Sequence, residues 1–177
     1  MPSSITAQLI GENQHALNQL EALLPRVEPE AYQRLLGAQS TQSLGRHVRH
    51  VLEHYQTLLD ACTALATPTT LDYERRQREA ALENDPAQAL ARVKMLQDTL
   101  ATLTVMPHDT PLTLRYPIKA NELDIPTSLG RELAFLTSHS VHHMALIGLL
   151  CEILGITLPK EFGVHPSTLR YWEQQAG

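Results

Sequence analysis

The segment SLGRELAFLTSHSVHHMALIGLLCEIL, residues 128–154, is the longest and most apolar stretch of this sequence with helical periodicity. It begins with Ser128, a preferred helix N-cap residue, and is followed by Gly155, which suits a helix C-cap. Its longest uninterrupted apolar run, Met144–Cys151, has eight residues and is too short to span a bilayer. We therefore expect a long core helix here and no contact with a membrane.

Other parts of the chain show the same periodicity between residues that helix ends prefer. Long helices are expected over residues 4–24 and 43–65, and a third begins at Asp85-Pro86 with an apolar seam that extends to Leu103. Shorter helices are expected near residues 31–36 and 166–175. The four long helices predict an all-α fold, an up-down bundle.

The connection between the third and fourth long helices has a different pattern. Residues 112–116 alternate between apolar and polar side chains as in a strand, and residues 119–121 suit a turn before residues 123–125. This pattern predicts a small β-hairpin, or an extended crossover, within one long connection of the four-helix bundle. We interpret residues 1–177 as a single domain.

Composition limits the classes of partner. The chain has 177 residues and a formal net charge of −5, which argues against binding that depends on Lys and Arg neutralising nucleic-acid phosphates. A chain of this length can build a core without disulfides, so we expect Cys62 and Cys151 to be free thiols. The sequence therefore favours a cytoplasmic protein that does not bind nucleic acid.

Histidines carry the strongest chemical signal. Six of the nine fall in two windows, one within residues 47–54 and one within residues 139–143. His139 and His143 are one helical turn apart, about 6 Å in rise, and face the middle of the apolar stripe, so both can bind one metal ion. A third histidine from another helix would complete a catalytic type of site with an open position.

The spacing alone leaves the third ligand open. His47, His50 and His54 line one flank of the second long helix, and a helical wheel favours His47 or His54 and ranks His50 last. Zinc, nickel and ferrous iron all accept imidazole ligands. The alternative is that these rings are core residues that hydrogen-bond a neighbour.

Two motifs resemble those of the DinB-like family of bacterial four-helix-bundle proteins, which includes metal-dependent enzymes. They are SLGRHVRH at residues 43–50 and HSVHH at residues 139–143. The resemblance implies a metal held by His50, His139 and His143. It leaves His47 and His54 as alternative ligands, or as neighbours that orient a ligand or carry a proton.

The resemblance also implies a reaction class, in which a divalent metal ion (zinc, nickel or iron) activates a thiol or water for transfer or hydrolysis. The expected partners are a small-molecule substrate or a low-molecular-weight thiol, and a second copy in a homodimer. No residue identifies the substrate or a catalytic base. The alternative is a non-catalytic helical bundle that acts through protein contacts, as in a stress response.

A run of arginines follows Pro68. Arg76 and Arg78, with Arg75, could anchor an anionic substrate, because the guanidinium fork binds carboxylates and phosphates. The alternative is a solvated turn balanced by the neighbouring acidic residues.

Overall fold

The structure, a computed structural model, describes residues 4–64 and 70–176. Its helices and strands follow the sequence patterns closely in their order. The α-helices are α1 (Ile5–Leu23), α2 (Pro29–Gln33), α3 (Leu44–Thr63), α4 (Ala80–Asn84), α5 (Pro86–Thr102), α6 (Leu129–Ile153) and α7 (Pro166–Ala176). Two 3-10 turns, Leu24–Arg26 and Leu103–Val105, extend α1 and α5, and the strands are β1 (Thr70–Leu71), β2 (Pro111–Ile118) and β3 (Asn121–Ser128).

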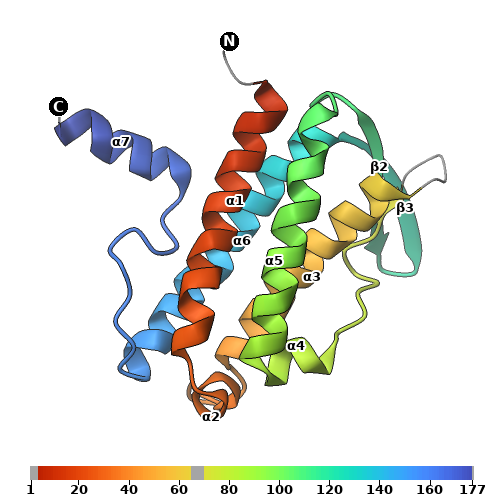
Figure 1. Ribbon diagram of the computed structural model, residues 1–177. Helices are drawn as coiled ribbons and strands as arrows, with labels where there is room; N and C mark the ends of the chain where they lie inside the picture. The colour runs from red at the N-terminus through yellow and green to blue at the C-terminus, as the bar shows by residue number, and fades with distance from the viewer. Residues whose placement is uncertain (1–3, 65–69, 177) are drawn as a thin grey trace.

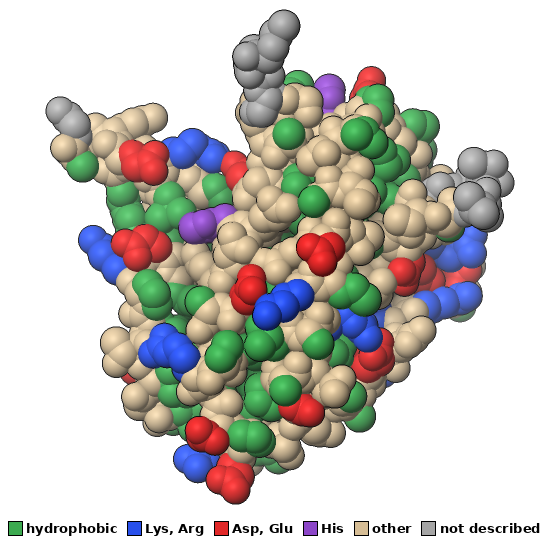
Figure 2. Space-filling model, in the orientation of Figure 1, with side chains coloured by type: hydrophobic (Ala, Val, Ile, Leu, Met, Phe, Trp, Pro, Cys, Tyr) green, Lys and Arg blue, Asp and Glu red, His purple; other side chains and the backbone are tan. Residues whose placement is uncertain are grey.

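The four long helices form the core of the molecule. Helices α1 and α5 lie in front of α6 and α3 in Figure 1, and α1 and α3 each pack against both α5 and α6. The buried side chains between them are mainly leucines, such as Leu17, Leu58 and Leu133. On the face drawn in Figure 2, acidic and basic side chains are interspersed.

The long helices begin at the residues that the sequence indicated, whereas the short helix expected near residues 31–36 is α2, which begins at Pro29 and ends at Gln33. The side chains of Ser4, Ser43, Asp85 and Ser128 each accept a hydrogen bond from a backbone N–H in the first turn. Such caps contribute about 1 kcal/mol each. Gly155 follows α6 with a φ of 73°, a conformation that favours glycine. The second long helix, expected over residues 43–65, ends at Thr63 with Ala64 in an extended conformation, and Leu65 lies outside the described residues.

The fold is mostly helical but not all-α, because the chain also forms a three-stranded sheet in the order β1-β2-β3. The expected hairpin is present, with β2 and β3 antiparallel. Strand β1, which pairs with β2 in parallel, and the single-turn helix α4 were not expected from the sequence. Both elements are too short to produce a periodic pattern. In Figure 1 the hairpin lies beside the C-terminal end of α3, on the opposite side of the molecule from α7.

Helix α6 is, among the helices described, the one whose length and composition would allow it to cross a membrane. In this structure it packs against α1 and α3. It also buries polar side chains, including Glu132 and Ser140.

A buried hydrogen-bond network joins three of the long helices. Asn13 of α1 donates to the carbonyl oxygen of Leu133 at 3.0 Å and accepts from the hydroxyl of Tyr55 at 2.8 Å. The Ser140 hydroxyl donates to the Tyr55 oxygen at 3.1 Å. Since buried polar groups are costly unless paired, this network specifies how α1, α3 and α6 align.

Candidate metal centre

Three histidines from two helices meet where α3 packs against α6. One ring nitrogen from each of His50, His139 and His143 lies within 4.8 Å of the others. The ring centroid of His50 is 5.0 Å from that of His139 and 4.4 Å from that of His143. This is the trio that the motif resemblance implied.

The helical wheel ranked His50 last because it measured distance from the middle of the α3 apolar stripe. The trio lies at the edge of the contact between α3 and α6, where His50 is half-buried, whereas His47 and His54 are more deeply buried. A ligand at the edge of a helix contact is therefore missed when only core-facing positions are considered.

The donor set fits a divalent metal ion. The Nε2 atom of His139 is buried and has no hydrogen-bond partner among the described residues. An unpaired buried polar atom costs about 1–3 kcal/mol, and coordination would satisfy this nitrogen. Imidazole ligands suit zinc, nickel and ferrous iron. His50, His139 and His143 could therefore hold such an ion.

Two further histidines surround the trio. The Nδ1 atoms of His47 and His143 lie 3.0 Å apart, so that one ring donates a hydrogen bond to the other. His54 donates from Nδ1 to the carbonyl oxygen of His50 at 2.8 Å, and its ring stacks on His139 with centroids 4.0 Å apart. When neutral, His54 therefore has a lone pair on Nε2.

The histidines are held in their neutral form by their surroundings. Burial is the main cause, and neighbouring histidines add to it, so that the pKa of His139 is lowered to about 4 and that of His143 to about 3. The pKa values of His47, His50 and His54 are lowered mainly by burial as well. A neutral imidazole has the lone pair that a metal needs.

Arg76 links the trio to a buried carboxylate. Its Nη1 donates to Nδ1 of His50 at 2.7 Å and lies 3.4 Å from Oε2 of Glu53, and its Nε donates to the carbonyl oxygen of Tyr73 at 2.6 Å. Glu53 is only 4% exposed and also accepts from the backbone N–H of Glu79. Glu53 was not among the residues expected at the site, although its position one helical turn after His50 could have indicated it.

The other predicted arginine lies elsewhere. Arg78 is exposed, has a φ of 53° and is not among the residues that line the cleft beside the histidines. Arg75 is also exposed and pairs with Asp72 and Glu122.

A cleft of about 340 Å³ opens beside the histidine trio. It reaches His50, His54 and His139, which leaves one side of the trio accessible to a small molecule. The remaining lining residues come from the segment after β1, from β2 and from α6: Tyr73, Glu74, Arg76, Leu114, Arg115, Tyr116, Arg131 and Phe135.

Glu132 fixes the position of one wall of this cleft. Its fully buried carboxylate accepts from the hydroxyl of Tyr73 at 2.9 Å and from that of Thr127 at 2.6 Å. Burial and the Glu132 charge raise the pKa of Tyr73, so this phenol stays protonated and donates. Tyr73 was not expected at the site from the sequence, because a single aromatic residue in a polar turn carries no pattern.

Comparison with known proteins identifies the family. The chain is 36% identical over 110 residues to "FK506-binding protein 5" of Rhizopus delemar, an alignment that covers 60% of this chain. It spans only 29% of the length of that relative. A sequence model described as the DinB family matches residues 1–164, which include all six histidines of the two windows. The protein therefore belongs to the DinB family.

Proposed function

We propose that this protein is a metal-dependent enzyme in which His50, His139 and His143 hold a divalent ion at the base of the cleft. The observation that carries the proposal is the meeting of three imidazole nitrogens within 4.8 Å, one of which, Nε2 of His139, is buried and unpaired among the described residues. Three protein ligands leave an open position, which is typical of catalytic sites.

A bound divalent ion would supply Lewis-acid chemistry, lowering the pKa of a thiol or water so that it becomes nucleophilic near neutral pH. His54 lines the cleft and has its Nε2 lone pair available, so this atom can accept a hydrogen bond from the nucleophile. His47 orients the ring of His143 through the contact between their Nδ1 atoms. Tyr73 and Phe135 line the cleft, and their rings would exclude water from this wall.

The reaction we propose is transfer of a low-molecular-weight thiol to a small electrophilic substrate, with hydrolysis as the second choice. The cleft of about 340 Å³ is large enough for a small molecule, which is compatible with thiol transfer and with hydrolysis. We also propose that residues 1–177 form one domain with the topology of an up-down four-helix bundle. The protein would be a homodimer located in the cytoplasm.

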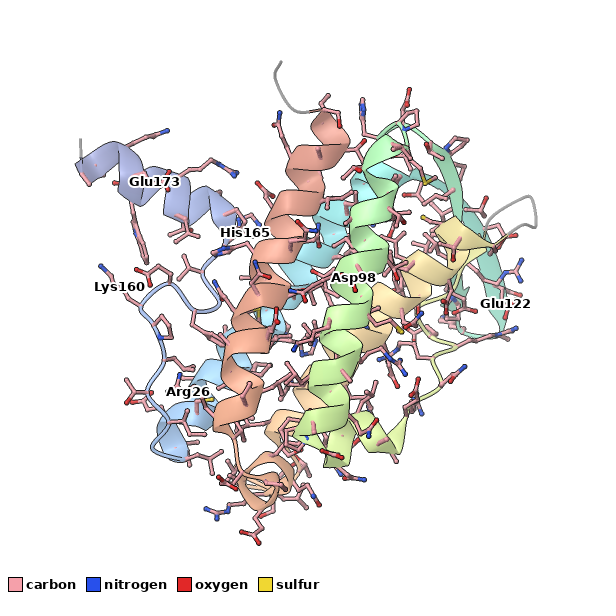
Figure 3. The ribbon with its side chains drawn as sticks, in the orientation of Figure 1. Arg26, Asp98, Glu122, Lys160, His165 and Glu173 are labelled. Atoms are coloured by element: carbon pink, nitrogen blue, oxygen red, sulfur yellow. The ribbon has the colours of Figure 1, made fainter. Side chains whose placement is uncertain are left out.

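A kinetic comparison tests this function. Zinc-, nickel- and iron-loaded protein would be mixed with glutathione or cysteine and 1-chloro-2,4-dinitrobenzene, and in a second assay with 4-nitrophenyl acetate. We expect metal-dependent turnover of one substrate type, lost in His139→Ala and kept in His165→Ala. His165 is the control because it precedes α7, on the side of the molecule away from the hairpin residue Glu122 (Figure 3), and neither belongs to the trio nor lines the cleft.

The result that would contradict the proposal is turnover no faster than in the metal-free protein with both substrate types. In that case the histidines would be packing residues or structural ligands. The non-catalytic helical-bundle protein, acting through protein contacts, would then be the better description.

A further inference from the structure

Arginines outnumber acidic residues in the lining of the cleft beside the histidines, although the chain as a whole is acidic. Its lining includes three arginines, Arg76, Arg115 and Arg131, but one glutamate, Glu74, whereas the chain carries a formal net charge of −5. Each arginine also pairs with a carboxylate outside the lining: Arg76 with Glu53, Arg115 with Asp124 and Arg131 with Glu132. An anion would therefore bind where a guanidinium keeps free N–H donors.

Two of the three arginines are already committed to internal partners. Arg76 bonds to His50 and to the carbonyl oxygen of Tyr73. Arg115 places its fork on Asp124 across the hairpin, at 3.0 and 3.1 Å. The cation best placed to receive a ligand is therefore Arg131.

Arg131 lies in the first turn of α6, and its side chain is 59% exposed. Its described contacts are one bond from Nη1 to Oε1 of Glu132 at 3.1 Å and a cation–π contact with the Phe135 ring at 5.4 Å. A guanidinium has five N–H donors in a planar fork, so most of this fork remains for a carboxylate or phosphate.

An apolar path leads from Arg131 to the histidines. Arg131, Phe135 and His139 follow one another at intervals of four residues on α6, so the Cα atoms of Arg131 and His139 are about 12 Å apart along the helix. The Phe135 ring lies between them, with its centroid 5.4 Å from that of His139.

The hairpin supplies the facing wall. Leu114 and Tyr116 of β2 both line the cleft, and Tyr116 is 49% exposed. Their directly paired residues on β3, Ile125 and Leu123, are 40% and 45% exposed and share the same face of the sheet. An exposed apolar face beside a cleft is typical of a ligand-binding surface.

We propose that the cleft binds an elongated amphipathic anion. Its carboxylate or phosphate would pair with Arg131, its apolar or aromatic body would lie between Phe135 and Tyr116, and its far end would reach the histidine trio. The assignment of the far end as the reacting end rests on the proposed function, but the binding mode itself does not.

The test uses metal-free, ¹⁵N-labelled protein, so that a ligand bond to a metal cannot contribute. Binding of 4-phenylbutyrate, 3-phenylpropyl phosphate and neutral 4-phenylbutanamide would be measured by NMR shift titration. We expect at least one anion to bind about fivefold to tenfold more tightly than the amide. Tighter binding of 4-phenylbutyrate would indicate a carboxylate ligand, and tighter binding of 3-phenylpropyl phosphate would indicate a phosphate ligand.

Variants locate the binding site. In Arg131→Gln the affinity for the anion should fall to that for the amide. In Arg170→Gln it should not change, because Arg170 is an exposed residue of α7 that pairs with Glu12. Phe135→Ala should weaken both ligands, and Phe135→Leu should recover part of the loss. Equal binding of anion and amide, or equal effects of Arg131→Gln and Arg170→Gln, would overturn the proposal.

A separate zinc titration keeps the two proposals apart. Arg131→Gln should bind zinc as the wild type does, because Arg131 is not in the trio. A wild-type protein that selects the anion but takes up no zinc would support this inference and contradict the proposed function. A wild-type protein that takes up zinc but binds the anion and the amide equally would contradict only this inference.

Discussion

Arg76 donates a hydrogen bond from Nη1 to Nδ1 of His50 at 2.7 Å. A neutral His50 ring that accepts this bond carries its proton on Nε2. A metal ion at Nδ1 would therefore have to displace Arg76, and one at Nε2 would have to displace that proton. Arg76 thus competes with a metal for His50, while its charge also repels a cation.

The first prediction follows from this competition. Arg76→Met should bind zinc several-fold more tightly than wild type, because the competing donor and its positive charge are removed. It should also lower the free energy of unfolding by about 2–4 kcal/mol, since the nearly buried Glu53 loses an ionic partner. A chromophoric chelator would report zinc affinity, and urea denaturation would report stability. Unchanged or weaker zinc binding in a folded variant would show that Arg76 does not oppose the metal.

His47 should matter for metal affinity without being one of the trio. Because its Nδ1 lies 3.0 Å from that of His143, His47→Ala removes the contact that orients this ring. Loss of such a supporting contact weakens metal binding about 10–100-fold. We expect that reduction in zinc affinity, with complete loss in His143→Ala and none in His165→Ala. If His47→Ala matches His165→Ala, the ring of His143 is held by packing alone.

The buried network on α1 should stabilise the fold rather than the metal site. Asn13→Ala would leave the Tyr55 hydroxyl and the Leu133 carbonyl without this partner and would create a small cavity. We expect a loss of about 2–4 kcal/mol in the free energy of unfolding, measured with urea. Asn18→Ala, at an exposed position on the same helix, should cost less than about 1 kcal/mol. Similar losses in both variants would contradict a special role for the network.

The two cysteines should be unreactive near neutral pH. Burial raises the pKa of Cys62 and of Cys151 to about 11, so the thiolate fraction at pH 8 is about a hundredfold below that of a thiol with a pKa of 9. Iodoacetamide should therefore modify native protein slowly at pH 8, faster as pH rises, and rapidly once urea unfolds the chain. Intact-mass spectrometry follows the modification. Rapid labelling of the native protein at pH 8 would show that a thiol of the chain is activated.

The helix positions could be predicted from sequence because caps and periodicity agree. Ser43, Asp85 and Ser128 each precede a long apolar seam, and each caps a helix. Strand β1 could not be predicted, because two residues gain their structure only by pairing with β2. The sheet is therefore a product of tertiary contacts that local patterns do not contain.

The candidate site was only partly predictable for a similar reason. The spacing of His139 and His143 places both on one face of one helix, so their partnership follows from helix geometry. Which histidine of α3 joins them depends on how α3 packs against α6, and the motif resemblance supplied that choice. Arg131 and Tyr116 come together only through the fold of the hairpin onto α6, which no local spacing shows.

The most direct test of the central claim is elemental analysis of tag-free protein purified without a nickel column. We predict about one equivalent of zinc, nickel or iron per chain, or uptake of one equivalent when Zn²⁺ or Ni²⁺ is added at neutral pH, and loss of that metal in a folded His139→Ala variant. Protein that contains no metal and takes none up would contradict the metal centre. Full retention of metal by His139→Ala would contradict the assignment of its ligands.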